Sequence, residues 1–246
     1  MSDIVYYVLS ALAVLIILTL HEYAHGYTAY KLGDGTARSL GRLSLNPIKH
    51  LDPLGALCML FFHFGWAKPV PINPRNFKNP RRDFALTALA GPLTNIVFAF
   101  FSAFIYLFVF ALVKNVQFES EFLFSLTENT LLFIWLFHTI NIGIGIFNLI
   151  PIPPLDGSRI LNVILPPRLY FGIMKHERKI YWIVIIWMLF GSNVKRALLA
   201  LPFVAANPVL SAIAGLFSLS DMLGKLIALI SNGMLNFWQL IPFLKT

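Results

Sequence analysis

Long stretches without a charged side chain constrain this sequence more than any other feature. Residues 4–20 form one such stretch, residues 84–113 form a second, and residues 129–150 form a third. An α-helix rises about 1.5 Å per residue, so about twenty apolar residues cross the hydrocarbon core of a bilayer. Each stretch therefore predicts a membrane-spanning helix, and the first helical pattern continues to Tyr30. The sequence predicts an all-α polytopic membrane protein with a core of three transmembrane helices.

Composition excludes several classes of protein. Of the 246 residues, 58% are apolar and 12% are charged, which is unlike a soluble domain. The net charge of +8 would need an exposed polar face to bind nucleic acid, and so apolar a chain offers none. The single cysteine, Cys58, forms neither an intramolecular disulfide nor a cysteine-rich zinc site. Any metal must therefore be held by histidine and carboxylate side chains.

The segments outside the three stretches differ in character. Residues 26–85 are rich in Gly, Pro and Asn, which predicts a structured loop. Its apolar part, residues 54–66, is short for a span and predicts a β-hairpin or a re-entrant segment after the first helix. A fourth apolar run at 180–190 predicts at least one further span. We expect a single integral membrane domain, with a core at 1–165 and a hydrophobic extension at 166–246.

The charges of the loops predict the topology. Residues 26–85 carry nine Lys or Arg residues, whereas residues 114–128 carry one lysine and three glutamates. Loops rich in Lys and Arg stay in the cytoplasm, so the N-terminus is expected outside and the first loop inside. The second and third spans then lead the chain out and back, which returns Asp156 to the side on which the first span ends.

A His-Glu-x-x-His run at the end of the first span carries the strongest chemical signal. His21 and His25 are one helical turn apart, so both imidazoles can reach one Zn²⁺ while Glu22 projects beside them toward a metal-bound water. A chance match is the alternative, because so short a pattern recurs in unrelated proteins. Ionisable groups at membrane depth are costly unless they are paired or bind a metal, which favours a metal site.

A catalytic zinc needs a third protein ligand and one open position. The candidates are the remaining histidines and acids, notably His50, Asp52, His63, His138 and Asp156. Asp156 ends a proline-rich run, which keeps the carboxylate at a defined place. The alternative role for Asp156 is the N-cap of a helix at 157–165. The predicted topology places Asp156 beside the two histidines, and we therefore prefer the ligand interpretation.

Four other polar residues have structural interpretations that we prefer. Asn95 is expected to make packing contacts or interhelical hydrogen bonds, with an active-site role as the second possibility. His138 and Asn141 suit an interhelical hydrogen-bonded pair better than a ligand set. Asp52 precedes a proline and suits an Asx turn.

Four motifs give the sequence a family resemblance. They read H-E-Y-A-H at 21–25, G-R-L-S-L-N-P-I-K-H-L-D-P-L-G at 41–55, A-G-P-L-T-N at 90–95 and F-N-L-I-P-I-P-P-L-D-G at 147–157. In this order they resemble the site-2 protease family (peptidase M50) of intramembrane zinc metalloproteases. The most similar branch is the compact prokaryotic one, which lacks an inserted PDZ domain.

The resemblance implies a role for each matching residue. His21, His25 and Asp156 would be the ligands of one zinc ion per chain, and Glu22 would be the catalytic base. Asn148 matches the asparagine that the family is thought to use to position substrate or stabilise the oxyanion. The implied activity is regulated intramembrane proteolysis of single-span membrane proteins, in the cell membrane, with the active site toward the cytoplasm.

Two rival functions use the same residues differently. A transporter or metal carrier would use the His and Asp side chains as a binding site along a permeation path, but the chain shows no internal repeat. A carrier also has no need of a non-ligating Glu22 between two ligand histidines. A catalytically inactive scaffold is disfavoured because Glu22 is intact.

Overall fold

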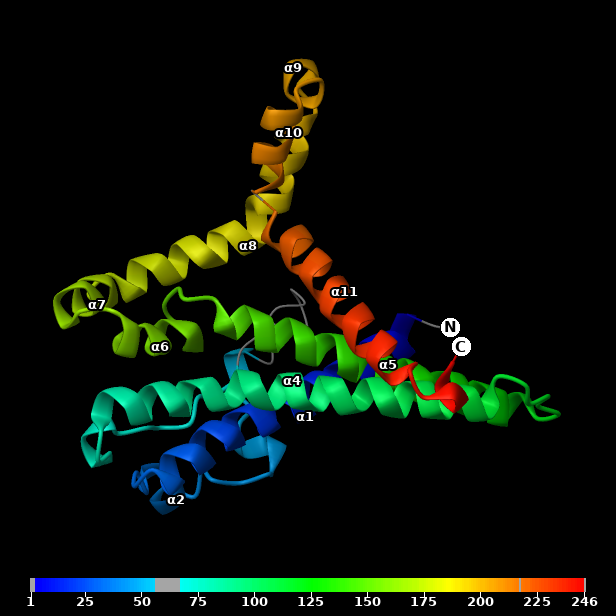
Figure 1. The fold of residues 1–246 in the computed structure, drawn as a ribbon, viewed down its shortest axis with the longest axis horizontal. Helices are drawn as coiled ribbons and strands as arrows, with labels where there is room; N and C mark the ends of the chain where they lie inside the picture. Colours follow the sequence, from blue (N-terminus) through cyan, green and yellow to red (C-terminus); the bar gives the residue numbers. More distant parts are fainter. Residues whose placement is uncertain (1–2, 56–66, 217, 246) are drawn as a thin grey trace.

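The structure is a computed structural model that describes residues 3–55, 67–216 and 218–245 (Figure 1). Within these ranges the elements of three or more residues are all helices. The α-helices are α1 (Asp3–Lys31), α2 (Thr36–Ser39), α4 (Pro80–Val113), α5 (Glu121–Leu149), α6 (Asp156–Ile164), α7 (Pro167–Met174), α8 (Glu177–Leu199), α9 (Pro202–Ala205), α10 (Pro208–Gly215) and α11 (Leu219–Trp238). Three short 3-10 helices are η1 (Pro47–Lys49), η2 (Pro74–Asn76) and η3 (Pro242–Leu244).

Helices α1, α4 and α5 are long and apolar enough to cross a membrane, which confirms the three predicted spans. All three start before their uncharged stretches, α1 by one residue, α4 by four and α5 by eight. Helix α4 begins at Pro80, a residue whose fixed φ suits the first helical position, and charged residues then occupy its first turn. Pro92 lies inside this helix and does not mark its start. The absence of charged side chains marks the part of a helix that lipid surrounds, and the helical backbone extends beyond that part.

Small residues let the three spans pack closely around α4, which contacts both α1 and α5 (Figure 1). The buried small residues of α4 are Ala85, Ala88, Gly91, Ala99, Ser102 and Ala103. By contrast, large apolar side chains such as Phe101 and Ile105 are exposed. Small residues at helix contacts and large ones facing outward are what a lipid environment favours, since lipid supplies no hydrophobic force between helices. The chain is a multi-pass membrane protein.

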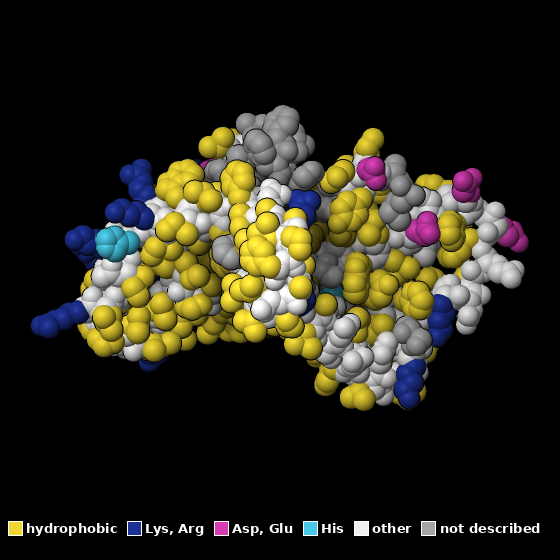
Figure 2. All heavy atoms as spheres, turned by 90° about the horizontal axis from the view of Figure 1, so that it is seen from above, with side chains coloured by type: hydrophobic (Ala, Val, Ile, Leu, Met, Phe, Trp, Pro, Cys, Tyr) yellow, Lys and Arg dark blue, Asp and Glu magenta, His cyan; other side chains and the backbone are white. Residues whose placement is uncertain are grey.

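Charged side chains gather at the ends of the molecule (Figure 2). Apolar side chains cover most of the face shown, Lys and Arg cluster at the end where α7 lies, and Asp and Glu gather toward the α4–α5 connection. This separation along the direction of the spans leaves an apolar band between two polar ends, as a bilayer requires.

The C-terminal part returns to the core after leaving it (Figure 1). Helix α8 is bent by 53° between Glu177–Met188 and Phe190–Leu199, and α8, α9 and α10 form an arm that projects from the three spans. Helix α11 then packs on α4 and α5. His138 Nε2 lies 2.9 Å from Ser231 Oγ, and Trp238 Nε1 donates to Phe100 O at 2.8 Å. Two polar contacts, of which the one at His138 is buried, thus attach the end of the extension to the core.

The predicted β-hairpin or re-entrant segment at 54–66 falls mainly on residues 56–66, which lie outside the described residues. On either side of this gap, Leu51 and Ala67 form an isolated antiparallel bridge, and Lys68 N donates to His50 O at 2.8 Å. The described residues therefore contain no hairpin strand, and the hairpin detail of the predicted fold is unsupported.

Candidate metal centre

Helix α1 places two imidazoles against each other. His21 and His25 are both buried, and their Nε2 atoms are 3.0 Å apart. This proximity follows from the spacing, because residues i and i+4 lie on one face of a helix.

Asp156, the first residue of α6, completes the cluster. Its Oδ2 lies 3.1 Å from His21 Nε2 and 3.2 Å from His25 Nε2, although 135 residues separate it from His21. Among the described residues, these three form the one group of His, Cys, Asp or Glu side chains arranged to hold a metal ion. The structure thus brings together the three residues that the sequence nominated.

Hydrogen bonds on the outer side of the cluster set the tautomers of both histidines. His25 Nδ1 lies 2.7 Å from Thr87 O, a carbonyl that can only accept, so Nδ1 carries the proton. His21 Nδ1 lies 3.0 Å from Asn95 Oδ1 and donates to it in the same way. Both Nε2 lone pairs therefore point inward, toward each other and toward the carboxylate oxygen. Metal-binding histidines usually have such an outer partner.

The three inward atoms suit a tetrahedral zinc. Zn²⁺ lies about 2.0–2.1 Å from His N and carboxylate O, and tetrahedral angles then separate the ligand atoms by about 3.3–3.4 Å. The observed separations of 3.0, 3.1 and 3.2 Å are close to this triangle. The Asp156 carboxylate would be the anionic ligand of this set, since a carboxyl group binds a metal in its ionised form.

Contacts at both ends of α6 place Asp156. The N-cap of this helix is Leu155, so the alternative role of Asp156 as an N-cap was wrong. At the other end, Arg81 Nε donates to Asn162 O and Arg81 Nη2 to Leu165 O, each at 2.9 Å. A cation at a helix C-terminus is favourable, because the last carbonyls have no partner within the helix. Arg81 therefore fastens α6 to α4.

One stripe of α4 forms the wall behind the histidines. Thr87, Gly91 and Asn95 are spaced by four residues and so lie on one helix face. A Cβ at Gly91 would lie 2.4 Å from His25 Nε2 and 2.6 Å from His21 Cε1, so the imidazoles need the space that glycine leaves. Asn95 is 1% exposed, and its bond to His21 on α1 confirms the predicted interhelical hydrogen bond. Because its partner is a candidate metal ligand, the second possibility, an active-site role, stays a prediction. The i, i+4, i+8 spacing was the signal that could have revealed this wall.

Glu22 lies beside the cluster without joining it. Its Oε2 accepts from Val70 N at 2.7 Å, which holds the carboxylate against the extended segment after residue 67. Buried Asp34 anchors the same segment, because its Oδ2 accepts from Asn73 N at 2.7 Å. Burial would raise the pKa of Asp34, but donors from Thr36, Asn73 and Asn76 hold it below its ordinary value. Sequence reasoning identified neither Val70 nor Asp34. Both contacts involve a backbone N–H, which every residue except proline has, so no residue pattern indicates them.

The other sequence candidates have partners of their own. Asn148 donates from Nδ2 to Ile144 O at 3.1 Å on its own helix, near the end of α5. His50 Nε2 bonds Ser44 O at 2.7 Å, and Asp52 Oδ1 accepts from Gly55 N at 2.9 Å, as the predicted turn requires.

Interhelical bonding of His138 was predicted correctly, but its partners are Ser231 Oγ and Ala99 O and not Asn141. Asn141 donates to Phe137 O on its own helix at 2.8 Å. His63 lies outside the described residues.

Comparisons with known proteins agree with this arrangement. The profile of peptidase family M50 matches residues 9–192. "Putative zinc metalloprotease YwhC" of Bacillus subtilis (strain 168) is 43% identical over 172 residues, which are 68% of this chain and 76% of that protein. "Putative zinc metalloprotease Rip2" of Mycolicibacterium smegmatis (strain ATCC 700084 / mc(2)155) is 25% identical over 177 residues, which are 70% of this chain and 63% of that protein. No solved structure matches the chain significantly.

Proposed function

Since the chain belongs to peptidase family M50, we propose that it is a site-2-type intramembrane zinc metalloprotease, which hydrolyses peptide bonds in or near transmembrane segments of other membrane proteins. The observation that supports this most is the convergence of three acceptor atoms beside a carboxylate that does not join them. His21, His25 and Asp156 would hold the metal, and Glu22 would act on water. We assign residues 1–246 to one membrane domain, with its core at 1–165 and the extension at 166–246.

A bound metal ion would account for the lone pairs that point inward from His21 and His25. Two neutral imidazoles and one carboxylate leave the fourth tetrahedral position for water or substrate, which is the ligand set of a catalytic zinc site. Zinc at this position would polarise the scissile carbonyl and lower the pKa of its bound water. Thr87 and Asn95 keep the imidazoles in the required tautomer and orientation.

Glu22 supplies the general base. Val70 N–H holds Oε2, so the carboxylate has a defined position one residue after His21, and its other oxygen is available to accept a proton. The same carboxyl group can return that proton to the leaving amine. Asn148 would position substrate or donate to the carbonyl oxygen through the second N–H of Nδ2, since one N–H is bonded to Ile144 O.

Proteolysis can be tested directly. Purified full-length protein in detergent or vesicles should cleave some members of a set of single-span membrane proteins, stop cleaving when a chelator is added, and resume when zinc is restored. If no substrate is cleaved while zinc flux across vesicles depends on His21 and His25, a metal carrier replaces the protease.

Metal content tests the ligand set. We expect about one zinc per chain in the wild type, measured by inductively coupled plasma mass spectrometry, and a large loss in His21→Ala, His25→Ala and Asp156→Ala, since each removes one of three protein ligands. Asp52→Ala is the control, because Asp52 serves a turn. Full occupancy in Asp156→Ala, with loss in Asp52→Ala, would contradict the assignment.

The loop charges support a cytoplasmic position for residues 26–85 and for the segment after α5, in a cell membrane. In a Cys58→Ser background, Lys175→Cys should react with a membrane-impermeant maleimide only from inside, and Glu119→Cys only from outside. Both side chains are exposed, so access does not limit labelling. The reverse pattern would refute the orientation.

A further inference from the structure

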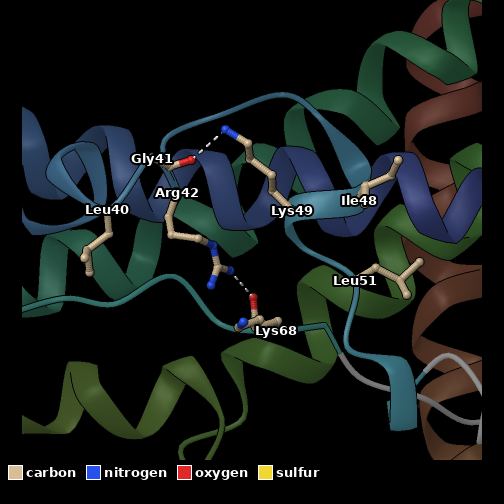
Figure 3. A pocket seen from close by; sticks show the side chains of 7 residues that line it. All are labelled: Leu40, Gly41, Arg42, Ile48, Lys49, Leu51 and Lys68. Atoms are coloured by element: carbon tan, nitrogen blue, oxygen red, sulfur yellow. Dashed lines mark hydrogen bonds between the residues drawn. The ribbon is translucent and has the colours of Figure 1, made fainter.

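A basic hollow of about 340 Å³, which none of the candidate metal ligands lines, opens beside α1 (Figure 3). Its walls combine cationic and aliphatic side chains, namely Arg42, Lys49 and Lys68 with Leu40, Ile48 and Leu51. Figure 3 shows the guanidinium of Arg42 between them, directed toward the backbone of Lys68. The proposed protease chemistry uses none of these side chains.

The three positive charges of the basic hollow have no acidic partner. Arg42 Nη2 donates to Lys68 O at 2.8 Å and Lys49 Nζ donates to Gly41 O at 3.0 Å, so both bind neutral carbonyls. Among the described residues, no ion pair involves Arg42, Lys49 or Lys68. Arg42 Nε is also buried without a hydrogen-bond partner among the described residues. The hollow therefore presents uncompensated positive charge and an unused donor.

The position of the basic hollow relative to the membrane follows from its contacts with α1. A Cβ at Gly26 would lie 3.4 Å from Leu43 and 3.1 Å from Val70, which are close in sequence to Arg42 and Lys68. Gly26 is six residues beyond Leu20, where the uncharged stretch ends, which is about 9 Å along a helix. The polar headgroup region begins where the hydrocarbon core ends, so this level of α1 lies among headgroups.

The aliphatic wall is too exposed for a site that faces water alone. Ile48 is 80% exposed, Leu40 is 63% exposed and Leu51 is 39% exposed. Aliphatic side chains interleaved with Lys and Arg suit the interface, where chains of lipid cover the former and phosphates meet the latter.

We propose that the basic hollow binds the phosphate of an anionic phospholipid, with the acyl chains lying against Leu40, Ile48 and Leu51. Arg42 and Lys49 offer donors that remain on their side chains beyond the bonds to carbonyls, and Lys68 adds an exposed ammonium. Charge and apolar contact act together here, so a soluble phosphate, which lacks acyl chains, binds more weakly.

Lipid binding can be measured on the full-length protein. The protein is reconstituted in bilayers of phosphatidylcholine with phosphatidylglycerol, extracted into detergent, and analysed for retained lipid by native mass spectrometry. Wild type should retain phosphatidylglycerol in preference to phosphatidylcholine. Each Lys→Gln change should weaken phosphatidylglycerol binding about fivefold, since one basic residue near the surface contributes about that much. The double variant K49Q/K68Q should thus show a loss of about 25-fold.

The variant K175Q/K179Q is the matched control, because it removes the same charge from exposed lysines elsewhere. An equal loss in this control would reduce the effect to general surface charge and overturn the site. Displacement of phosphatidylglycerol by an equal concentration of inorganic phosphate would overturn the lipid assignment, as would a wild type without preference. If K49Q/K68Q does not fold, K68Q alone decides, since the Lys68 ammonium has no hydrogen bond or ion pair among the described residues.

Discussion

Glu22→Gln should abolish nearly all hydrolysis while the protein keeps its zinc. Gln matches Glu in size and can still contact Val70 N–H through its amide oxygen, so the fold and the three metal ligands are undisturbed. It cannot take a proton from water, and general-base catalysis typically contributes about 10²–10⁴-fold to the rate. We expect cleavage of a membrane substrate to fall by at least this factor, with metal content unchanged.

Two further measurements make this result decisive. Asn148→Ala should be milder, about 10²–10³-fold as for one lost oxyanion donor, again without loss of zinc. Asp52→Ala, a change in a turn, should cleave at the wild-type rate. Cleavage by Glu22→Gln at the wild-type rate would show that Glu22 is not the base.

Gly91→Ala should empty the metal site through a single added methyl group. That methyl group would lie 2.4 Å from His25 Nε2 and 2.6 Å from His21 Cε1, well inside van der Waals contact. The imidazoles are fixed on α1 and held by Thr87 and Asn95, so relief requires either α4 or the rings to move. We expect zinc affinity to fall by more than the 10–100-fold that changes to outer partners of a metal site usually cause. Hydrolysis should fall with it.

Gly224→Ala is the control for this substitution. It adds the same methyl group to helix α11, where no atom other than the neighbouring backbone of that helix lies within 4 Å of the new position. Thermal unfolding of both variants separates loss of the site from loss of the fold. A Gly91→Ala protein that binds zinc as tightly as the wild type would show that α4 does not form the wall described for the metal centre.

The membrane fold could be predicted from the sequence because its causes are local. A stretch without charge must form a helix in lipid, where each backbone N–H and C=O needs a partner within the segment. This made α1, α4 and α5 predictable, along with the pairing of His21 and His25 on one helix face. The start of α4 was missed because a helix continues past the lipid into polar surroundings, where hydrophobicity no longer marks it.

Asp156, the third member of the metal cluster, could be predicted only in part from local sequence. Prolines and loop charges argued for Asp156 over His50 or His138, but the distance of 3.1 Å to His21 depends on how α6 lies on α4. Arg81 of α4 donates to carbonyls at the C-terminal end of α6 and so joins the two helices, and no spacing in the sequence connects Arg81 with Asp156.

The sequence by itself thus determined the spans, the pair of histidines and the residue types available to bind zinc, since these follow from helix periodicity and transfer of side chains to lipid. Only the tertiary structure decided the second partner of each imidazole, the space at Gly91 and the bond from Val70 to Glu22. These contacts join α1 to residues more than forty positions away, through a carbonyl, an absent side chain and a backbone N–H. Backbone carbonyls, backbone N–H groups and glycines occur throughout the chain. Their role at the site therefore depends on where the fold places them and not on residue identity.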